Sequence, residues 1–315
     1  MAGLDLLVVG DAMVDLTVKP PPSRKGGAYP STIVVSPGGL GNVAAAAADC
    51  GARVGFAGRV GKDVLGEMYI RDLRSNGVRS FVRRSHLPTG ICINFIHPGG
   101  ERTMYTTRGA NDLLVSRDVP DSLLRLTRMV FVSGFSMETA KSATEIEKVC
   151  NRAKARGSQV AVGGGAFNII TRRRERFRRM ISSNADILVL NQKEALALSG
   201  KTAVRPALDA LQALVGFLVV TLGRRGSILC RNGSVTRIPA PRSPGRAIDT
   251  TGAGDVFAGT LLAGLLLGKG AIESIRQAHI RAGKSVAHLG PRPPRWPSER
   301  SIRPVCPPNS TTWPF

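Results

Sequence analysis

The heptad Asp249–Asp255, which reads Asp-Thr-Thr-Gly-Ala-Gly-Asp, places two carboxylates around a glycine-containing turn. The apolar stretch that follows, residues 256–267, is predicted to be a helix that begins within the heptad. The first N–H groups of a helix have no partner inside it and, together with the helix dipole, attract negative charge. The backbone amides of Gly252, Ala253 and Gly254 are therefore predicted to hold an anion.

Asp255 is an odd neighbour for an anion site, because its carboxylate would repel the anion. The arrangement is explained if Asp255 accepts a proton while the three amides hold a charged phosphoryl group. The simpler interpretation is an N-cap, supplied by Thr250 or Thr251, in front of a buried helix. Seven specified positions favour the catalytic interpretation, although the motif alone identifies no substrate.

The composition is that of a globular chain. Its 315 residues are enough for one or two domains with a large core, and 43% of them are hydrophobic. No apolar run approaches the length needed to cross a bilayer, and the N-terminus lacks the basic region of a signal peptide. The default expectation is a cytoplasmic protein. Five scattered cysteines argue against both a disulfide framework and a zinc site.

The net charge is unusually high, because 44 basic residues face 22 acidic ones and leave +22. Such a field concentrates anions, including nucleotides and nucleic acids. The densest run, residues 172–179, has Phe177 and Ile181 at helical spacing, which predicts an amphipathic helix with a solvated basic face. No aromatic-interleaved RNA-binding signature accompanies it. A non-catalytic, nucleic-acid-binding basic protein is the alternative from another functional class, but specific nucleic-acid binding is not expected.

Apolar runs of strand length alternate with helical stretches along the chain. This alternation predicts an α/β domain with helices on both faces of a mainly parallel sheet. The predicted strands are 6–10, 54–58, 129–133, 160–162, 187–190 and 218–221, and the predicted helices are 42–50, 66–76, 142–156, 173–182 and 194–199.

Two segments, about 16–36 and 87–108, alternate in the manner of strands and carry glycine turns. They are predicted to form a small sheet outside the main layer, with the natural role of a flap over the active site. Exposed edges in such a lid often pair with a second chain, which suggests a homodimer. We therefore expect one domain over residues 1–290. The Pro/Arg-rich tail 291–315 is expected to be extended or disordered.

Three further motifs are weak when each is taken alone. In residues 36–42 a Gly-Gly pair permits a close backbone approach before a predicted helix, with Asn42 at its start. Asn191 and Glu194 follow a predicted strand, where they suit either water-mediated Mg²⁺ binding or a helix cap. The turn 221–226 follows another strand end, where ligands bind in α/β sheets. Because no P-loop and no early GxGxxG is present, a nucleotide must bind in another way.

As an ordered set, these motifs resemble the ribokinase (PfkB-type) family of sugar and nucleoside kinases over roughly residues 5–290. The resemblance implies a three-layer ribokinase-like α/β fold with a small β-sheet lid, ATP as donor, Mg²⁺ as cofactor and, as in several members, K⁺. The matching segments, in the family's order, are Gly10-Asp11 with Asp15, then 38–42, 58–66, 109–111, Asn191 with Glu194, 221–226 and 249–255.

The resemblance also assigns roles to individual residues. Asp255 is the catalytic base, and Gly252, Ala253 and Gly254 form the anion hole for the transferring phosphoryl group. The remaining matches are Asp15, Gly39 and Asn42 for the acceptor, with Asn111 from the lid side; Asn191 and Glu194 for phosphate and, through water, Mg²⁺; Thr221, Gly223 and Gly226 for the nucleotide; His279 near adenine, or else on a helix surface; and Asp249 for a monovalent cation.

The chain departs from the family pattern in ways that bear on the acceptor. Met13 stands where ribose-specific members usually have asparagine, and the Gly-Gly to Asn spacing is one residue shorter than usual. Residues 163–165 are all glycine, where many relatives have an Asp-Pro turn. Met13 and the shorter loop make ribose a doubtful substrate, without naming a replacement.

We predict an ATP-dependent kinase that phosphorylates a hydroxyl of a small sugar or related polyol. A nucleoside kinase is the alternative within the family, and it would need an apolar or aromatic base pocket beneath the lid. Phe95 and Tyr105 are candidate walls of that pocket, or equally part of the core of the lid. Arg108, at the lid edge, could read an acidic acceptor, although a solvent-facing arginine is the stronger expectation. No membrane partner is expected.

Overall fold

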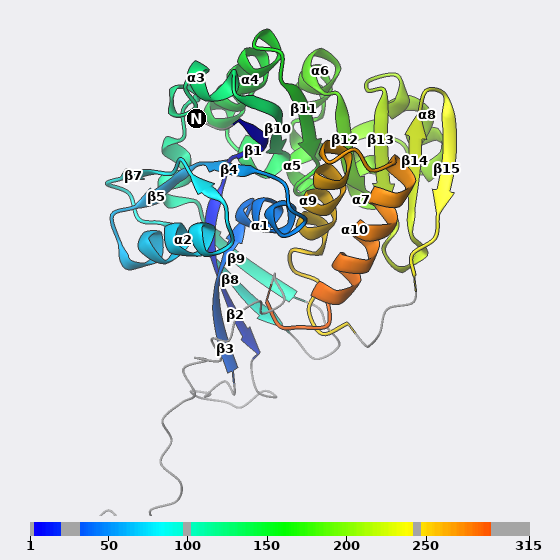
Figure 1. Cartoon of the computed structure of the whole chain (residues 1–315). Coiled ribbons are helices and arrows are strands. Elements are labelled where there is room, and N and C mark those ends of the chain that lie inside the picture. Colours follow the sequence, from blue (N-terminus) through cyan, green and yellow to red (C-terminus); the bar gives the residue numbers. More distant parts are fainter. Residues whose placement is uncertain (1–2, 20–31, 97–101, 242–246, 291–315) are drawn as a thin grey trace, which may run out of the picture.

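A nine-stranded sheet forms the centre of the protein in a computed structural model that describes residues 3–19, 32–96, 102–241 and 247–290 (Figure 1). Its order is β15-β14-β13-β12-β11-β10-β1-β4-β6, parallel from β6 to β13 and antiparallel at β13–β14–β15. The strands are β1 Leu4–Val9, β4 Val54–Ala57, β6 Arg79–Ser80, β10 Thr127–Ser133, β11 Gln159–Gly163, β12 Ile187–Asn191, β13 Phe217–Thr221, β14 Ser227–Arg231 and β15 Ser234–Ile238.

All six predicted strands are confirmed as neighbouring parallel strands of this sheet. Their runs are continuously apolar because both faces of the sheet are covered. Leu7 and Val9 of β1 belong to one hydrophobic core, whereas Leu6 and Val8 belong to the other. The hairpin β14–β15 was not predicted, because its polar residues give a weaker signal than a continuous apolar run.

Helices cover both faces of the sheet. One core includes residues of α1, α2, α9 and α10, and the other includes residues of α3 to α8. Among the described residues, no helix is both long and apolar enough to cross a membrane. The helices are α1 Gly41–Asp49, α2 Val64–Ser75, α3 Asp121–Leu124, α4 Ala140–Ala155, α5 Phe167–Arg172, α6 Arg174–Asn184, α7 Gln192–Ser199, α8 Val204–Gln212, α9 Ala253–Leu266 and α10 Ala271–Ser285.

A separate four-stranded sheet, in the order β3-β2-β8-β9, projects from one end of the main layer and forms the lid (Figure 1). Its strands are β2 Ala12–Lys19, β3 Thr32–Gly39, β8 Gly90–Ile96 and β9 Arg102–Thr107. β2 begins only three residues after β1 ends, so Asp15 lies within the lid. A further short pair joins β5 Arg59–Gly61 to β7 Arg83–Ser85. Most of the first predicted lid turn (residues 20–31) and the tail 291–315 lie outside the described residues.

The predicted site motifs follow the carboxyl ends of parallel strands. Gly10 follows β1, Asn191 ends β12 and Thr221 ends β13. Residues 134–137 and Gly164, which were not assigned to the site from the sequence, follow β10 and β11 in the same way. Because the strands are parallel, these ends share one edge of the sheet, which is where α/β sheets bind ligands. The topology therefore gathers motifs that lie up to 211 positions apart in the sequence, from Gly10 to Thr221.

Candidate active site

The heptad starts α9 as predicted. Gly252 is the N-cap residue in the left-handed conformation (φ 72°), and α9 begins at Ala253 with Asp255 in its first turn. Glycine adopts this conformation without the steric cost that other residues meet. The simpler interpretation is wrong, because the N-cap is a glycine and neither Thr250 nor Thr251 occupies that position. A Cβ added at Gly254 would meet no other atom within 4 Å, so the helix start borders open space.

These two glycines give a matched pair of variants. Gly252→Ala is expected to destabilise the fold by about 1–2 kcal/mol, because alanine is strained at positive φ. Gly254→Ala should leave stability unchanged or slightly raised, yet lower kcat/KM about tenfold by placing a methyl group where the phosphoryl group would lie. Thermal unfolding and steady-state kinetics of both variants check this. Equal losses of stability in the two would contradict it.

Asp255 contacts Asn42 across the interface between α9 and α1. The Asn42 Nδ2 donates to Asp255 Oδ2 at 3.3 Å. One turn farther along α9, the two helices pack so closely that a Cβ at Gly259 would collide with the Val43 carbonyl oxygen of α1. This close packing lets Asn42 and Asp255 meet. The structure thus brings together two residues that are 213 positions apart.

The Gly-Gly pair lets β3 approach Asp15. A side chain at Gly38 would collide with the Asp15 carboxylate, and Gly39 has a φ of 55° that turns the chain from β3 toward α1. The Leu40 N–H then donates to the Asp11 carbonyl at 3.0 Å. Asp15 is buried against this turn. The predicted acceptor positions Asp15, Gly39 and Asn42 are therefore linked through the turn from β3 to α1.

Asn111 is buried in the short 3₁₀ helix η1 (Gly109–Leu113), next to the base of the lid. Its Oδ1 accepts from the Ala12 N–H at 2.7 Å. Its Nδ2 donates to the Ala12 carbonyl at 3.1 Å and to the Arg108 carbonyl at 2.8 Å. These bonds fasten η1 to β2. Acceptor binding by Asn111 stays a prediction, whereas its role in positioning the lid strand is visible in its contacts.

Arg108 is not the solvent-facing arginine that was expected. Its side chain is only 12% exposed and pairs with Asp11 at 2.8 Å, Asp112 at 2.7 Å and Glu138 at 3.6 Å. The expectation was wrong because three carboxylates converge on this position from separate segments of the chain. The guanidinium ties the end of β9 to the residues after β1 and β10.

Asn191 and Glu194 form a reciprocal cap at the start of α7. The Glu194 N–H donates to Asn191 Oδ1 at 3.0 Å, and the Asn191 N–H donates to Glu194 Oε2 at 2.8 Å. The pKa of Glu194 is raised to about 7, mainly by burial; the bond from the Asn191 N–H lowers it, and the negative charge of Asp255 raises it. Glu194 therefore caps α7 and also lies close enough to Asp255 to interact with its charge.

The triple glycine makes room for Glu194, because a Cβ at Gly164 would collide with its Oε2. Among the described residues, no group of three or more His, Cys, Asp or Glu side chains could hold a metal ion. A buried carboxylate without an all-protein metal cage fits Mg²⁺, which commonly keeps several waters and binds substrate phosphates. Binding of Mg²⁺ through water by Glu194 stays a prediction.

The nucleotide turn lies next to the Asn191 cap. Thr221 is directly opposite Asn191 in the β12–β13 register. Gly223 and Gly226 both have positive φ, and a Cβ at Gly226 would collide with the Ile238 carbonyl oxygen. The two motifs that were assigned to phosphate and nucleotide are therefore neighbours.

His279 is 9% exposed, so its placement on a helix surface is wrong. Its Nε2 lies 3.0 Å from Ser227 Oγ, and its ring packs against Phe257 at 4.9 Å. Burial lowers its pKa, which favours the neutral ring. A contact with adenine stays a prediction.

Asp249 is buried and holds two segments together. Its Oδ1 accepts from the Thr251 N–H at 2.8 Å and hydroxyl at 2.6 Å, and its Oδ2 accepts from the Gly290 N–H at 3.0 Å. The carboxylate thereby fixes the turn before α9 to the chain that leaves α10.

Comparison with known proteins decides the family. The model of the pfkB family of carbohydrate kinases matches residues 4–298. The chain belongs to this family. Members of this family are ATP-dependent kinases.

Among curated relatives, the Bifunctional protein HldE of Pseudomonas fluorescens strain SBW25 is 30% identical over 303 residues, covering 90% of this chain and 60% of that protein. The chain thus spans only part of that relative. Among solved structures, adenosine kinase from Sinorhizobium meliloti has a TM-score of 0.84 at 28% identity, covering 93% of this chain and 96% of that one. A probable sugar kinase from Rhizobium etli CFN 42 has 0.85 at 25%, with the same coverage. Overall similarity therefore does not separate the two acceptor classes.

One segment of this pfkB-family site was absent from the sequence-based assignment. Ser136, in the 3₁₀ turn after β10, accepts the Asp11 N–H at 3.2 Å, and a side chain at Gly134 would collide with the Gly164 carbonyl oxygen. The signal that finds it is its place after the carboxyl end of β10, as with the other motifs.

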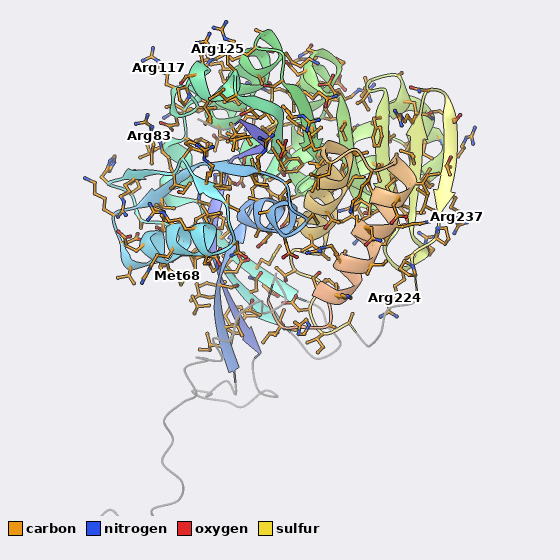
Figure 2. All side chains as sticks on the ribbon, in the orientation of Figure 1. Met68, Arg83, Arg117, Arg125, Arg224 and Arg237 are labelled. Atoms are coloured by element: carbon orange, nitrogen blue, oxygen red, sulfur yellow. The ribbon has the colours of Figure 1, made fainter. Side chains whose placement is uncertain are left out.

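The positive charge of the kinase is spread over its surface. Figure 2 shows Arg83, Arg117 and Arg125 projecting outward from one side and Arg224 and Arg237 from the other. The predicted helix with the basic run is α6, and its own residues Phe177 and Ile181 are buried. Its Arg176 pairs with Glu147 at 2.7 Å. Part of this basic run therefore serves local structure.

Proposed function

We propose that this kinase transfers the γ-phosphoryl group of ATP to a hydroxyl of a small sugar or related polyol in the cytoplasm. The observation that supports this proposal is the arrangement at the start of α9. Asp255 lies one residue beyond the glycine-bounded amides, contacts Asn42, and is close enough to Glu194 to raise the pKa of its carboxyl group.

In the proposed mechanism, the acceptor hydroxyl donates its proton to Asp255 as its oxygen forms a bond to the γ-phosphorus. The bond from phosphorus to the leaving oxygen of ADP breaks in line with this attack. The N–H groups of Gly252, Ala253 and Gly254 stabilise the charge on the phosphoryl oxygens. Asn42 orients the base, and Asp15 and Gly39 position the acceptor.

The proposed cofactors are Mg²⁺, held through water by Glu194, and K⁺ near Asp249. Bound there, Mg²⁺ would neutralise negative charge on the phosphates. Both oxygens of Asp249 already accept hydrogen bonds, so its part toward K⁺ would be to supply negative charge beside other oxygen ligands.

The proposal is tested by incubating the protein with Mg-ATP and a panel of sugars, 2-keto-3-deoxy acids and nucleosides. ADP release and product mass identify the acceptor. Phosphorylation of a sugar supports the proposal, and phosphorylation of nucleosides alone favours the nucleoside kinase. Salt-sensitive RNA binding without phosphoryl transfer would favour the non-catalytic alternative.

We also propose a homodimer through the outer face of the lid. Ile33, Val35 and Tyr105 are exposed there, and Tyr105 is 63% exposed. They lie on the two edge strands of the lid, and the apolar Val18, Ile93 and Phe95 lie between them on the same face. An exposed apolar surface of this kind marks an interaction site. Tyr105→Glu is expected to shift the protein from dimer to monomer in light scattering, whereas Val235→Glu, on the distant strand β15, should not. A monomeric wild-type protein would contradict this.

A further inference from the structure

A strip of polar side chains follows the inner face of the lid beyond Asp15. Thr17 is on the same face of β2, two residues farther along, and Ser36 and Asn94 lie beside these positions on β3 and β8. Thr17 is 0% exposed and Asn94 is 1% exposed. Since a strand rises about 3.4 Å per residue, the strip extends about 7 Å past Asp15.

The polar atoms of this strip are poorly satisfied. Thr17 Oγ1 and Ser36 Oγ are inaccessible to solvent and have no hydrogen-bond partner among the described residues. Among the bonds between described residues, the Asn94 Nδ2 donates only to the Cys92 carbonyl, at 3.5 Å, and its Oδ1 lies 3.6 Å from the Cys92 sulfur. Buried polar groups are normally hydrogen-bonded, so each of these requires an explanation.

The strip faces the catalytic end of the molecule. A Cβ at Gly290 would lie 3.6 Å from Val34 and 3.9 Å from Ser36 Oγ, both on the inner face. The Gly290 N–H is held by Asp249, the first residue of the heptad. On the opposite face, Val14 belongs to the core that includes α1 and α2, and Leu16 packs against that core.

The fold of the lid gives no reason for polar residues here. Valine has the shape of threonine, favours strands and would bury no hydroxyl. The aromatic pair Phe95 and Tyr105 also lies on the outer face, in register with Val18 and Ile93. Those two residues therefore do not form walls of an acceptor pocket on the inner face, and that expectation was wrong.

We propose that Thr17 and Asn94, with Ser36 beside them, bind hydroxyl groups of the acceptor that are remote from the hydroxyl receiving the phosphoryl group. The acceptor is accordingly a polyhydroxylated sugar or polyol that reaches from Asp255 past Asp15 to this strip. A nucleoside would instead place its base at this strip, so phosphorylation of nucleosides alone would contradict the proposal. This inference rests on the proposed function and specifies its substrate class.

The test uses the full-length protein and the best sugar or polyol from the acceptor panel, together with its analogue that lacks the remote hydroxyl. Thr17→Val and Asn94→Leu are expected to lower kcat/KM for the complete acceptor about tenfold and to leave kcat/KM for the deoxy analogue unchanged. Thr17→Ser should retain activity. Thr107→Val, on the exposed outer face, is the matched control and should behave as wild type.

A second readout separates binding from folding. Because Thr17→Val removes a buried hydroxyl without a partner, it should not lower the thermal unfolding midpoint of the protein without acceptor, even as activity falls. Equal losses toward both acceptors, or no loss, would overturn the inference. Phosphorylation of nucleosides only would also overturn it while leaving the kinase intact. Absence of phosphoryl transfer to any acceptor would instead refute the proposed function.

Discussion

Asp255→Asn is expected to lower kcat about 10²- to 10⁴-fold, the usual contribution of a general base. Asparagine keeps the size of the side chain and can still accept from Asn42 Nδ2 through its own oxygen, so the helix start should be preserved. What it cannot do is accept the proton of the attacking hydroxyl. The loss should therefore appear in kcat, with little change in the KM for ATP.

Single-turnover and steady-state assays with the best acceptor measure this effect, and circular dichroism monitors folding. Asp209→Asn, an exposed carboxylate on α8 that pairs with Arg205, is the matched control and should keep full activity. Retained turnover in Asp255→Asn would mean that the base lies elsewhere. A large loss of stability would mean that the carboxylate is structural.

The architecture could be predicted from the sequence because its strongest signals are local. Continuous apolar runs such as 187–190 have few alternatives to a buried parallel strand. The start of β2 was harder to place, because β2 follows β1 within three residues and only Gly10 and Asp11 separate them. The edge hairpin β14–β15 was missed for its mixed polarity.

The site was predictable where a motif carries its own geometry, as with Asn191 and Glu194, whose spacing is that of a capping box. It was less predictable where the environment is made by distant residues. Arg108 is buried by carboxylates from three other positions, and His279 is buried by packing of α10 on α9 and β14. The orientation of Phe95 depended on strand register, in which a shift of one residue exchanges the two faces.

Glu194→Gln is expected to stabilise the protein at alkaline pH, measured in EDTA without nucleotide. The pKa of Glu194 is about 7 in the folded protein against an ordinary 4.5, with burial as the main cause. Between these values the folded state binds more protons than the unfolded chain, so the contribution of Glu194 to stability falls as pH rises from 4.5 to 7. The difference of 2.5 pKa units corresponds to about 3 kcal/mol, since each unit is worth about 1.4 kcal/mol.

Glutamine cannot ionise but can still accept from the Asn191 N–H. The free energy of unfolding of Glu194→Gln should therefore equal that of wild type below pH 4.5, exceed it increasingly up to pH 7, and stay above it by a constant amount beyond. Urea titrations across this range measure it, with the exposed Glu175→Gln as control. A pH-independent difference would contradict the buried charge. Because the Asp255 charge also raises this pKa, the same titration in an Asp255→Asn background should shift its midpoint to lower pH, which would directly demonstrate that the two carboxylates interact.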